Sequence, residues 1–455
     1  MRGSAVYAHL WGTDELRDVF ADEGRLQSWL DILAALAQAQ ADLSIVPAEA
    51  AAEIAAASRI ERLDLDYLVA ETRATSHSTL GLIRAMQRVL SPTAGEWYCY
   101  GATVQDVSDT WTALCIRRVG AALWRDLRAI EDRLLDHARR HRDLAMPGRT
   151  HGQTGLPVTL GFKVAVWAAE VDRHLDRLSE GAGRWLVGEL GGAAGTGSFW
   201  GEQAPALLER FCARLGLFAP EIPWDSSRDR LGEFACVLGL ITQTLAKIGN
   251  EVVELARPEI GELAERFSPG EVGSITMPHK RNPERAEHLV TLARLVRAQM
   301  TVLVESMIVA HERDGRSWKA EWAAFPDLCL LTGASCAMAR GLVDGLVANP
   351  EAMARNLEGG GGYVHSERVM RALAERTGKQ TAHTLVYDAA MAGREAGLSF
   401  RQALERSPEI VKHLSPADLD RLLDPAEALA SAGAYVDRVL ELLERKRAEQ
   451  PPSWP

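Results

Sequence analysis

The sequence predicts an all-α protein built around a bundle of long helices. The clearest observation is a run of eight apolar residues between Leu231 and Leu255 that alternate at spacings of three and four. Two further runs, Ile116 to Leu134 and Leu160 to Leu178, keep the same spacing. Such runs form one apolar seam along a helix, and a seam must pack on other helices. Helices of roughly 25 to 40 residues exceed the usual length in a globular domain, which suggests a bundle shared between subunits of a homotetramer.

At 455 residues the chain is long enough for two or three domains. We expect an N-terminal helical domain over residues 1–111, a central long-helix domain over 112–356 and a small helical domain over 357–455. The first holds an alanine-rich helical stretch from Phe20 to Ala57, broken at Val46 and Pro47, in which Trp29, Leu33 and Leu36 share a face. Shorter helices are expected at 63–72 and 80–89. Four glycines at 359–362 mark the last boundary, and the charged end after Glu444 reads as frayed.

Composition excludes several classes of function. The net charge of -11 argues against nucleic acid and anionic membranes as partners, because both require a basic face. No stretch approaches 18 uninterrupted apolar residues and no signal segment begins the chain, so we expect a cytoplasmic protein. The six cysteines lack metal-binding or redox spacing and read as buried thiols. The twelve histidines form no metal motif and no nucleotide-binding glycine motif is present, so we expect neither metal nor cofactor.

The segment Gly273 to Pro283 combines a serine, a lysine and a helix start. Ser274 is followed six residues later by Lys280, and a long helical pattern begins near Glu284. A serine oxygen becomes a base only when cations and N-H donors stabilise its alkoxide, and a helix N-terminus offers such donors. The loop is therefore a candidate for one activated oxygen and one carboxylate-binding cation. On spacing alone, an ordinary solvated turn is the plainer interpretation.

This segment resembles the signature loop of the fumarase/aspartase superfamily, G-S-S-x-M-P-x-K-x-N. Only Ile275 departs, standing where the family usually has a second serine. The resemblance implies that Ser274 is the catalytic base, that Lys280 and Asn282 hold a substrate carboxylate, and that three chains of a homotetramer build each site. The matching positions are Gly273, Ser274, Met277, Pro278, Lys280 and Asn282.

Three other segments are similar to regions of the adenylosuccinate lyase and 3-carboxymuconate cycloisomerase branch. The run 148–153 matches a region whose histidine is the general acid, which implies that role for His151, with Thr150 and Gln153 binding substrate. The loop 100–110 is closest to the cycloisomerase form and makes Thr103 and Gln105 candidates for a carboxylate contact. Helix capping by Ser108 or Asp109 is the plainer interpretation of that loop. In the run 75–79, His77 and Ser78 are substrate-site candidates, although a histidine at a helix start is more often a cap.

The segment 311–322 bears on the substrate. Arg313 belongs to an E-R-D sequence shared with purine adenylosuccinate lyases, but Trp318 and Trp322 stand where those enzymes place a serine and an arginine that hold the nucleotide phosphate. Indoles cannot replace a hydroxyl and a guanidinium as phosphate ligands, so a purine substrate is not expected. Core packing and the lining of a smaller site remain open for the two tryptophans.

Taken together, the resemblance implies a lyase that removes a proton beside a carboxylate of a small anionic dicarboxylate and expels a group to give fumarate. The combination of His151 with Trp318 and Trp322 looks like nitrosuccinate lyases of secondary metabolism, which release nitrite. The alternative enzyme is a 3-carboxy-cis,cis-muconate cycloisomerase, favoured by the 100–110 loop and disfavoured by His151. A non-catalytic structural homologue is the alternative from another class.

Overall fold

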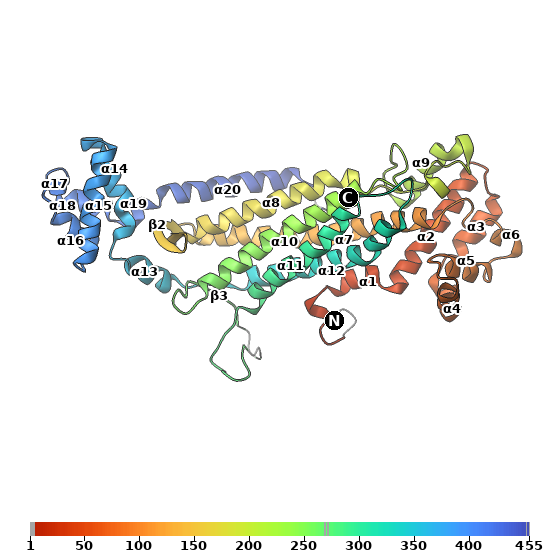
Figure 1. Cartoon of the computed structure of the whole chain (residues 1–455), viewed down its shortest axis with the longest axis horizontal. Helices are drawn as coiled ribbons and strands as arrows, with labels where there is room; N and C mark the ends of the chain where they lie inside the picture. The colour runs from red at the N-terminus through yellow and green to blue at the C-terminus, as the bar shows by residue number, and fades with distance from the viewer. Residues whose placement is uncertain (1–4, 268–269, 271–272, 452, 455) are drawn as a thin grey trace.

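The computed structural model describes residues 5–267, 270, 273–451 and 453–454. The molecule is elongated, with long helices running along its length, the N-terminal helices at one end and a cluster of short helices at the other (Figure 1). In the described residues, strands contribute only two small antiparallel pairs. The all-α fold class is confirmed.

The N-terminal helices gather at the right of Figure 1, beside α9. The predicted break at Val46 and Pro47 falls between α2 and α3, and Trp29, Leu33 and Leu36 are buried as their spacing predicts. The elements of this end are η1 (Ala8–Leu10), α1 (Asp14–Phe20), α2 (Asp22–Asp42), α3 (Ala48–Ala57), η2 (Ile60–Arg62), α4 (Leu65–Thr75), α5 (Leu80–Gln87), α6 (Pro92–Gly95), η3 (Gly192–Ala194), η4 (Gly201–Gln203) and α9 (Ala204–Leu215).

Five long helices form the central bundle: α7 (Val104–Arg140), α8 (Leu160–Trp185), α10 (Asp229–Leu255), α11 (Glu284–Glu305) and α12 (Gly315–Asp344). All eight residues of the seam between Leu231 and Leu255 are buried, as are the apolar runs on α7 and α8. Burying a Leu, Ile or Phe side chain stabilises the fold by about 1.5–3 kcal/mol, so these seams hold the bundle together.

Glycines on α10 let α11 pack closely against it. A Cβ added at Gly249 would lie 2.6 Å from the backbone oxygen of Ala286, and one added at Gly239 would lie 2.5 Å from the sulfur of Met300. Side chains at these positions would push the two helices apart. The close α10–α11 packing in turn sets the position of the loop that leads into α11.

A β-hairpin interrupts the helices between α7 and α8. Strands β1 (Ala145–Thr150) and β2 (Gln153–Thr159) pair antiparallel, with Thr150 opposite Gln153 and a bulge between Pro147 and Arg149. No strand was predicted here from the sequence. The two connecting residues, His151 and Gly152, have φ of 53° and 73°, and positive φ at both positions is what the tightest hairpin turn requires. A second short pair joins β3 (Leu263–Glu265) to β4 (Leu346–Ala348).

The C-terminal third has two parts. A separate apolar core forms under the short helices at the left of Figure 1, and it contains residues such as Val369, Phe400 and Leu419. The elements here are α13 (Pro350–Glu358), η5 (Tyr363–His365), α14 (Ser366–Thr377), α15 (Lys379–Glu395), α16 (Phe400–Glu405), α17 (Pro408–Val411), α18 (Pro416–Leu422) and α19 (Pro425–Ala428).

The last helix, α20 (Ala430–Glu449), returns along α8 and joins the main core (Figure 1). The expectation of a frayed end after Glu444 is wrong for the described residues. The helix continues to Glu449, and Trp454 is 6% exposed, with its ring near those of Trp124 and Trp185. Burial of this indole against α7 and α8 anchors the end of the chain.

Among the described residues, α10 and α12 are long and apolar enough to meet the criteria for a membrane span. However, 67% and 61% of their most apolar windows are buried inside the fold. Packing within the bundle therefore accounts for their composition.

Candidate active site

The residues singled out by the sequence lie in three separate places in one chain (Figure 1). The first group surrounds the start of α7 and includes Thr103, Gln105 and Arg313. The second is the tip of the β1–β2 hairpin at the far end of the bundle. The third is the loop between β3 and α11, which hangs from the side of the bundle (Figure 1). A single chain therefore does not bring Ser274, His151 and Thr103 together.

The loop with Ser274 is exposed and folds back on itself. The Ser274 hydroxyl oxygen accepts a hydrogen bond from the backbone N-H of Met277 at 3.0 Å. The Asn282 side-chain amide donates to the carbonyl of Gly273 at 2.8 Å, which closes the loop across nine residues. Ile275 is 96% exposed, and Met277 and Lys280 also face solvent. Asn282 thus has a structural contact in this chain in addition to the carboxylate contact that the resemblance implies.

The start of α11 already has an anionic partner. Glu265 on β3 accepts hydrogen bonds from the backbone N-H groups of Arg285 at 3.3 Å and Ala286 at 2.7 Å. These two N-H groups are therefore occupied by Glu265, which contradicts the expectation that the donors of this helix start stabilise a serine alkoxide. A carboxylate at a helix N-terminus satisfies donors that the helix itself leaves open. Lys280 is consequently the better candidate for a substrate-binding cation in this loop.

His151 occupies the exposed tip of the hairpin, between Thr150 and Gln153, which are also exposed. Behind the tip, Arg149 donates to both carboxylate oxygens of Glu262 at 2.8 and 2.6 Å. The Asn356 amide also donates to Glu262 at 2.7 Å. This bidentate pair ties the hairpin to the turn before β3. His151 is therefore exposed at the tip of an anchored hairpin.

Arg313 is the centre of the group at the start of α7. It lies in the segment between α11 and α12, and its Nε donates to the Gln105 amide oxygen at 2.7 Å. Its Nη2 contacts Asp225 Oδ1 at 3.1 Å and the carbonyl of Gly192 at 3.2 Å. Its Nη1 reaches only the Thr103 hydroxyl, at 3.5 Å. The guanidinium is thus held by three contacts through Nε and Nη2, whereas Nη1 is only weakly bonded. The Arg313 side chain is 28% exposed.

Gln105 is 1% exposed, and its polar atoms have protein partners. Its amide nitrogen donates to Asp109 at 3.0 Å and to the carbonyl of Asp225 at 2.7 Å, while its oxygen accepts from Arg313. This geometry favours a supporting role for Gln105 over the direct substrate contact expected from the sequence.

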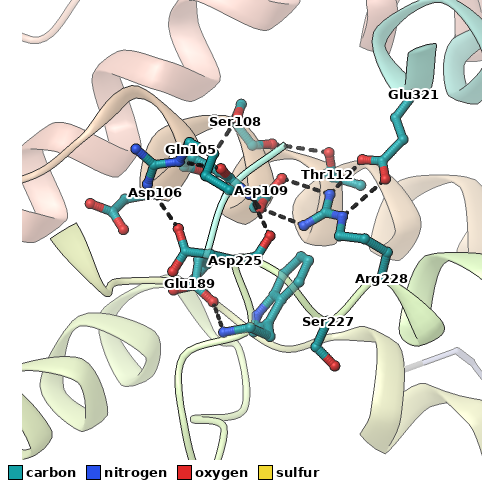
Figure 2. A network of polar contacts seen from close by, with 12 residues as sticks. Gln105, Asp106, Ser108, Asp109, Thr112, Glu189, Asp225, Ser227, Arg228 and Glu321 are labelled. Atoms are coloured by element: carbon teal, nitrogen blue, oxygen red, sulfur yellow. Dashed lines mark hydrogen bonds and ion pairs between the residues drawn. The ribbon is translucent and has the colours of Figure 1, made fainter. Parts of the chain in front are cut away.

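A buried ion network lies behind this group (Figure 2). Arg228, just before α10, forms a bidentate pair with Asp109 on α7 at 2.7 and 3.0 Å. Its Nε also donates to Glu321 on α12 at 2.9 Å. Burial raises the pKa of Glu321, and Arg228 opposes this shift. The network joins α7, the start of α10 and α12. Removing one partner from a buried pair leaves an uncompensated charge, so disruption of the network would strongly destabilise the fold.

Three further carboxyl groups lie beside Arg313. Oxygens of Asp106, Glu189 and Asp225 lie within 4.8 Å of one another, and all three residues are buried. Burial raises the pKa of Asp106 to about 7 and, together with Asp225, raises the pKa of Glu189 to about 10. Burial also raises the pKa of Asp225, while the Arg313 contact opposes the shift. The sequence analysis missed this group because residues at 106, 189 and 225 show no common spacing.

A small cavity of about 50 Å³ lies between α2, α7 and α12. Trp318 and Trp322 line it, with ring centres 4.7 Å apart. Ser78 also lines the cavity, which places one of the expected site residues near the start of α7. The neighbouring His77 accepts hydrogen bonds at Nδ1 from the backbone N-H groups of Thr79 at 3.4 Å and Leu80 at 3.3 Å. His77 therefore caps α5, which is the plainer of the two interpretations.

Comparison with known proteins gives consistent results. Residues 11–298 match the family described as Lyase, and residues 362–439 match the family described as Adenylosuccinate lyase C-terminus. The chain is 42% identical over 430 residues to N-acetyl-S-(2-succino)cysteine lyase of Dickeya dadantii (strain 3937), covering 94% of each chain. It is 41% identical to 3-carboxy-cis,cis-muconate cycloisomerase of Pseudomonas aeruginosa, covering 93% of each. The crystal structure of 3-carboxy-cis,cis-muconate lactonizing enzyme from Pseudomonas putida superposes with a TM-score of 0.90 at 36% identity, covering 97% of this chain and 99% of that one.

Proposed function

Since this chain belongs to the fumarase/aspartase superfamily of lyases, in the branch of adenylosuccinate lyases and 3-carboxy-cis,cis-muconate cycloisomerases, we propose that it eliminates a leaving group from a 2-substituted succinate to give fumarate. Membership makes it an enzyme of the lyase class. The observation that carries the proposal is the exposed loop that places Ser274, Met277, Lys280 and Asn282 in the superfamily's signature order.

In the proposed reaction, Ser274 takes a proton from the carbon next to one substrate carboxylate. The electron pair moves into that carboxylate, whose growing charge Lys280 and Asn282 stabilise. The bond between the neighbouring carbon and the leaving group then breaks, the double bond of fumarate forms, and the leaving group departs with the bonding electrons. Thr150, Gln153, Thr103 and Arg313 orient the substrate, and His151 donates a hydrogen bond or proton to the departing group.

A thiol is the best-supported leaving group. The lyase from Dickeya dadantii is named for a succinyl thioether of cysteine, and the identity extends over nearly the whole of both chains. A thiol has a pKa near 8.5, so a thiolate departs with much less acid assistance than an amine. Our expectation of nitrite release has no support from the named relatives, and nitrosuccinate becomes the second substrate to test.

Trp318 and Trp322 disfavour a nucleotide substrate. Phosphate recognition requires charged or hydroxyl donors, and the two indoles offer neither. These observations support the exclusion of a purine nucleotide substrate.

Cyclisation of 3-carboxy-cis,cis-muconate is the second candidate. It is favoured by the 41% identity to the Pseudomonas aeruginosa cycloisomerase and by the close fit to the Pseudomonas putida structure. This reaction forms a ring by intramolecular addition and releases no fumarate. It is distinguished from the first candidate by loss of the diene absorbance when the muconate is the substrate.

We infer a homotetramer in which each site combines loops from three chains. Support comes from the separation of the three groups within one chain (Figure 1). Exposed apolar residues on the long helices also favour burial against other copies, among them Val166, Leu240, Leu295, Val302 and Val304. A cytoplasmic location, a role in secondary metabolism and the domain bounds 1–111, 112–356 and 357–455 remain predictions.

The deciding experiment offers the purified protein a panel of substrates: N-acetyl-S-(2-succino)cysteine, nitrosuccinate, adenylosuccinate and 3-carboxy-cis,cis-muconate. We expect fumarate and one equivalent of free thiol from the first. Fumarate with nitrite would transfer the proposal to nitrosuccinate. Loss of diene absorbance from the muconate without fumarate from any other compound would replace elimination by cyclisation.

A further inference from the structure

The cluster of Asp106, Glu189 and Asp225 has more acceptors than donors. Asp106 accepts hydrogen bonds from the backbone N-H groups of Thr103, Gly191 and Gly192, at 2.7, 2.8 and 3.1 Å. One oxygen of Glu189 accepts from the backbone N-H of Trp224 at 2.5 Å. The other oxygen of Glu189 and the Oδ2 atom of Asp225 are buried and have no donor in the described part of the chain.

Acidic groups also outnumber basic groups in this part of the protein. Five buried carboxyl groups lie in this network, where Arg228 is paired with two of them (Figure 2). Arg313 contacts a third, that of Asp225. Several unneutralised negative charges cannot remain close together in a region of low dielectric, so some of these carboxyl groups must bind protons or cations. The five carboxyl groups belong to Asp106, Asp109, Glu189, Asp225 and Glu321.

A proton fits the available atoms better than a metal ion. Hard divalent cations take six or more oxygen ligands, and the cluster has only two oxygens without a donor. A single O-H group on Glu189 that donates to Asp225 satisfies both of these oxygens at once. The close glycines support a compact arrangement, because a Cβ added at Gly191 or Gly195 would lie 2.7 or 2.9 Å from Asp225 Oδ2.

We propose that Glu189 and Asp225 share one proton across their two unpartnered oxygens, and that this bridged pair is the support that positions Arg313 in the active site. With Oδ2 of Asp225 held by Glu189, its Oδ1 is aimed at Arg313 Nη2. Together with Gln105 and Gly192, this contact fixes the guanidinium and leaves its Nη1 edge toward Thr103. Glu189 and Asp225 are thus positioning residues that act through Arg313.

The groups that face Glu189 come from several elements. Asp106 and Asp109 lie on α7, Asp225 and Arg228 lie in or next to the turn before α10, and Arg313 lies before α12. Cys212 on α9 is a thiol whose raised pKa keeps it neutral near pH 7. Burial and the neighbouring carboxylates raise the pKa of Glu189 to about 10, so its proton is retained at neutral pH and is lost only in alkali.

Infrared spectroscopy tests the shared proton without any measurement of activity. We expect the wild type at pH 7 to show a carboxylic-acid C=O band that Glu189→Gln lacks. Glu180→Gln should retain this band. Glu180, on α8, is the matched control because it lies outside the network. Absence of the band from the wild type, or a divalent metal bound at one equivalent per chain, would overturn the shared proton.

The stability of the protein gives a second readout. A Glu189 pKa near 10 in the fold, against about 4.5 unfolded, means that the folded state binds one more proton between these values. The stability that this proton contributes is therefore fully present in acid and is lost as pH rises through this window. We expect the unfolding equilibrium constant of the wild type to rise tenfold more per pH unit than that of Glu189→Gln, between pH 6 and 9. Equal slopes would contradict the proposal.

The positioning role rests on the proposed function and is tested separately, with the substrate that the panel identifies. An amide at 189 can still donate to Asp225, whereas leucine cannot. We expect the fold-increase of KM in Glu189→Leu to exceed the fold-decrease of kcat at least tenfold, and Glu189→Gln to restore most of the wild-type KM. Loss of the Glu189 proton in alkali should raise the KM of the wild type, and Glu189→Gln should lack this rise. Equal KM values for the two variants would overturn the positioning role while leaving the infrared result intact. If no substrate in the panel reacts, the proposed function fails and the proton bridge is still decided by the band.

Discussion

Within the described residues, the hydrogen bonds that hold Ser274 come from its own loop. Its hydroxyl oxygen accepts from the Met277 N-H, and the Asn282 amide closes the loop through Gly273. An isolated hydroxyl is a weak base, so in our proposal the remaining stabilisation of the alkoxide comes from groups that meet the loop in the assembled protein.

The first prediction concerns Ser274. We expect Ser274→Ala to lower kcat by about 10²–10⁴-fold, the usual contribution of a general base, with the circular dichroism spectrum and oligomeric size unchanged. The control is Ile275→Ala at the neighbouring, 96% exposed position, which should keep most of the activity. Full activity in Ser274→Ala would remove this residue from the mechanism.

His151 gives a prediction about the leaving group. Because its φ is 53°, alanine would strain the hairpin turn, whereas asparagine tolerates this conformation. We expect His151→Asn to lower kcat by less than about tenfold with a thioether substrate, since a thiolate leaves with little acid assistance. A loss of several orders of magnitude, measured by fumarate release, would indicate a basic leaving group such as an amine.

Among the elements, α10 and α11 depend on small residues where they touch. Gly249 lies against the backbone of Ala286, whereas Gly183, near the end of α8, has no atom within 4 Å of an added Cβ. The same substitution should therefore have opposite effects at the two positions.

We expect Gly249→Ala to destabilise the fold by about 1–3 kcal/mol, because the methyl group would force α10 and α11 apart. Gly183→Ala should stabilise it by about 0.5–1 kcal/mol, because alanine favours the helix. Urea unfolding of the two variants beside the wild type measures both effects. A similar change at both positions would mean that α10 and α11 can separate at no cost.

At the scale of the whole molecule, the long bundle places the hairpin tip and the Arg313 group at opposite ends (Figure 1). We expect mixtures of Ser274→Ala and Arg313→Ala chains, unfolded and refolded together, to regain activity that neither variant shows alone. In such mixtures some sites receive an intact loop from one chain and an intact Arg313 from another. Refolding each variant alone is the control, and no recovery in the mixture would place both residues of a site in one chain.

The sequence by itself determined the helices and the chemistry of the loop. Apolar residues at spacings of three and four define which face of α7, α8 and α10 is buried, because that periodicity is local. The order of Ser274, Lys280 and Asn282 identified the superfamily for the same reason. The hairpin at His151 was not predicted, since it depends on the positive φ angles of two residues, which the sequence does not show.

Only the tertiary structure decided which polar residues meet. Gln105 and Glu265 proved to be committed to protein partners, and Asp106, Glu189 and Asp225 came together from three distant segments. The return of α20 and the burial of Trp454 were equally invisible to local patterns. Helical periodicity acts over a few residues, whereas the pairing of buried charges depends on how helices far apart in the chain pack, and no local spacing records that packing.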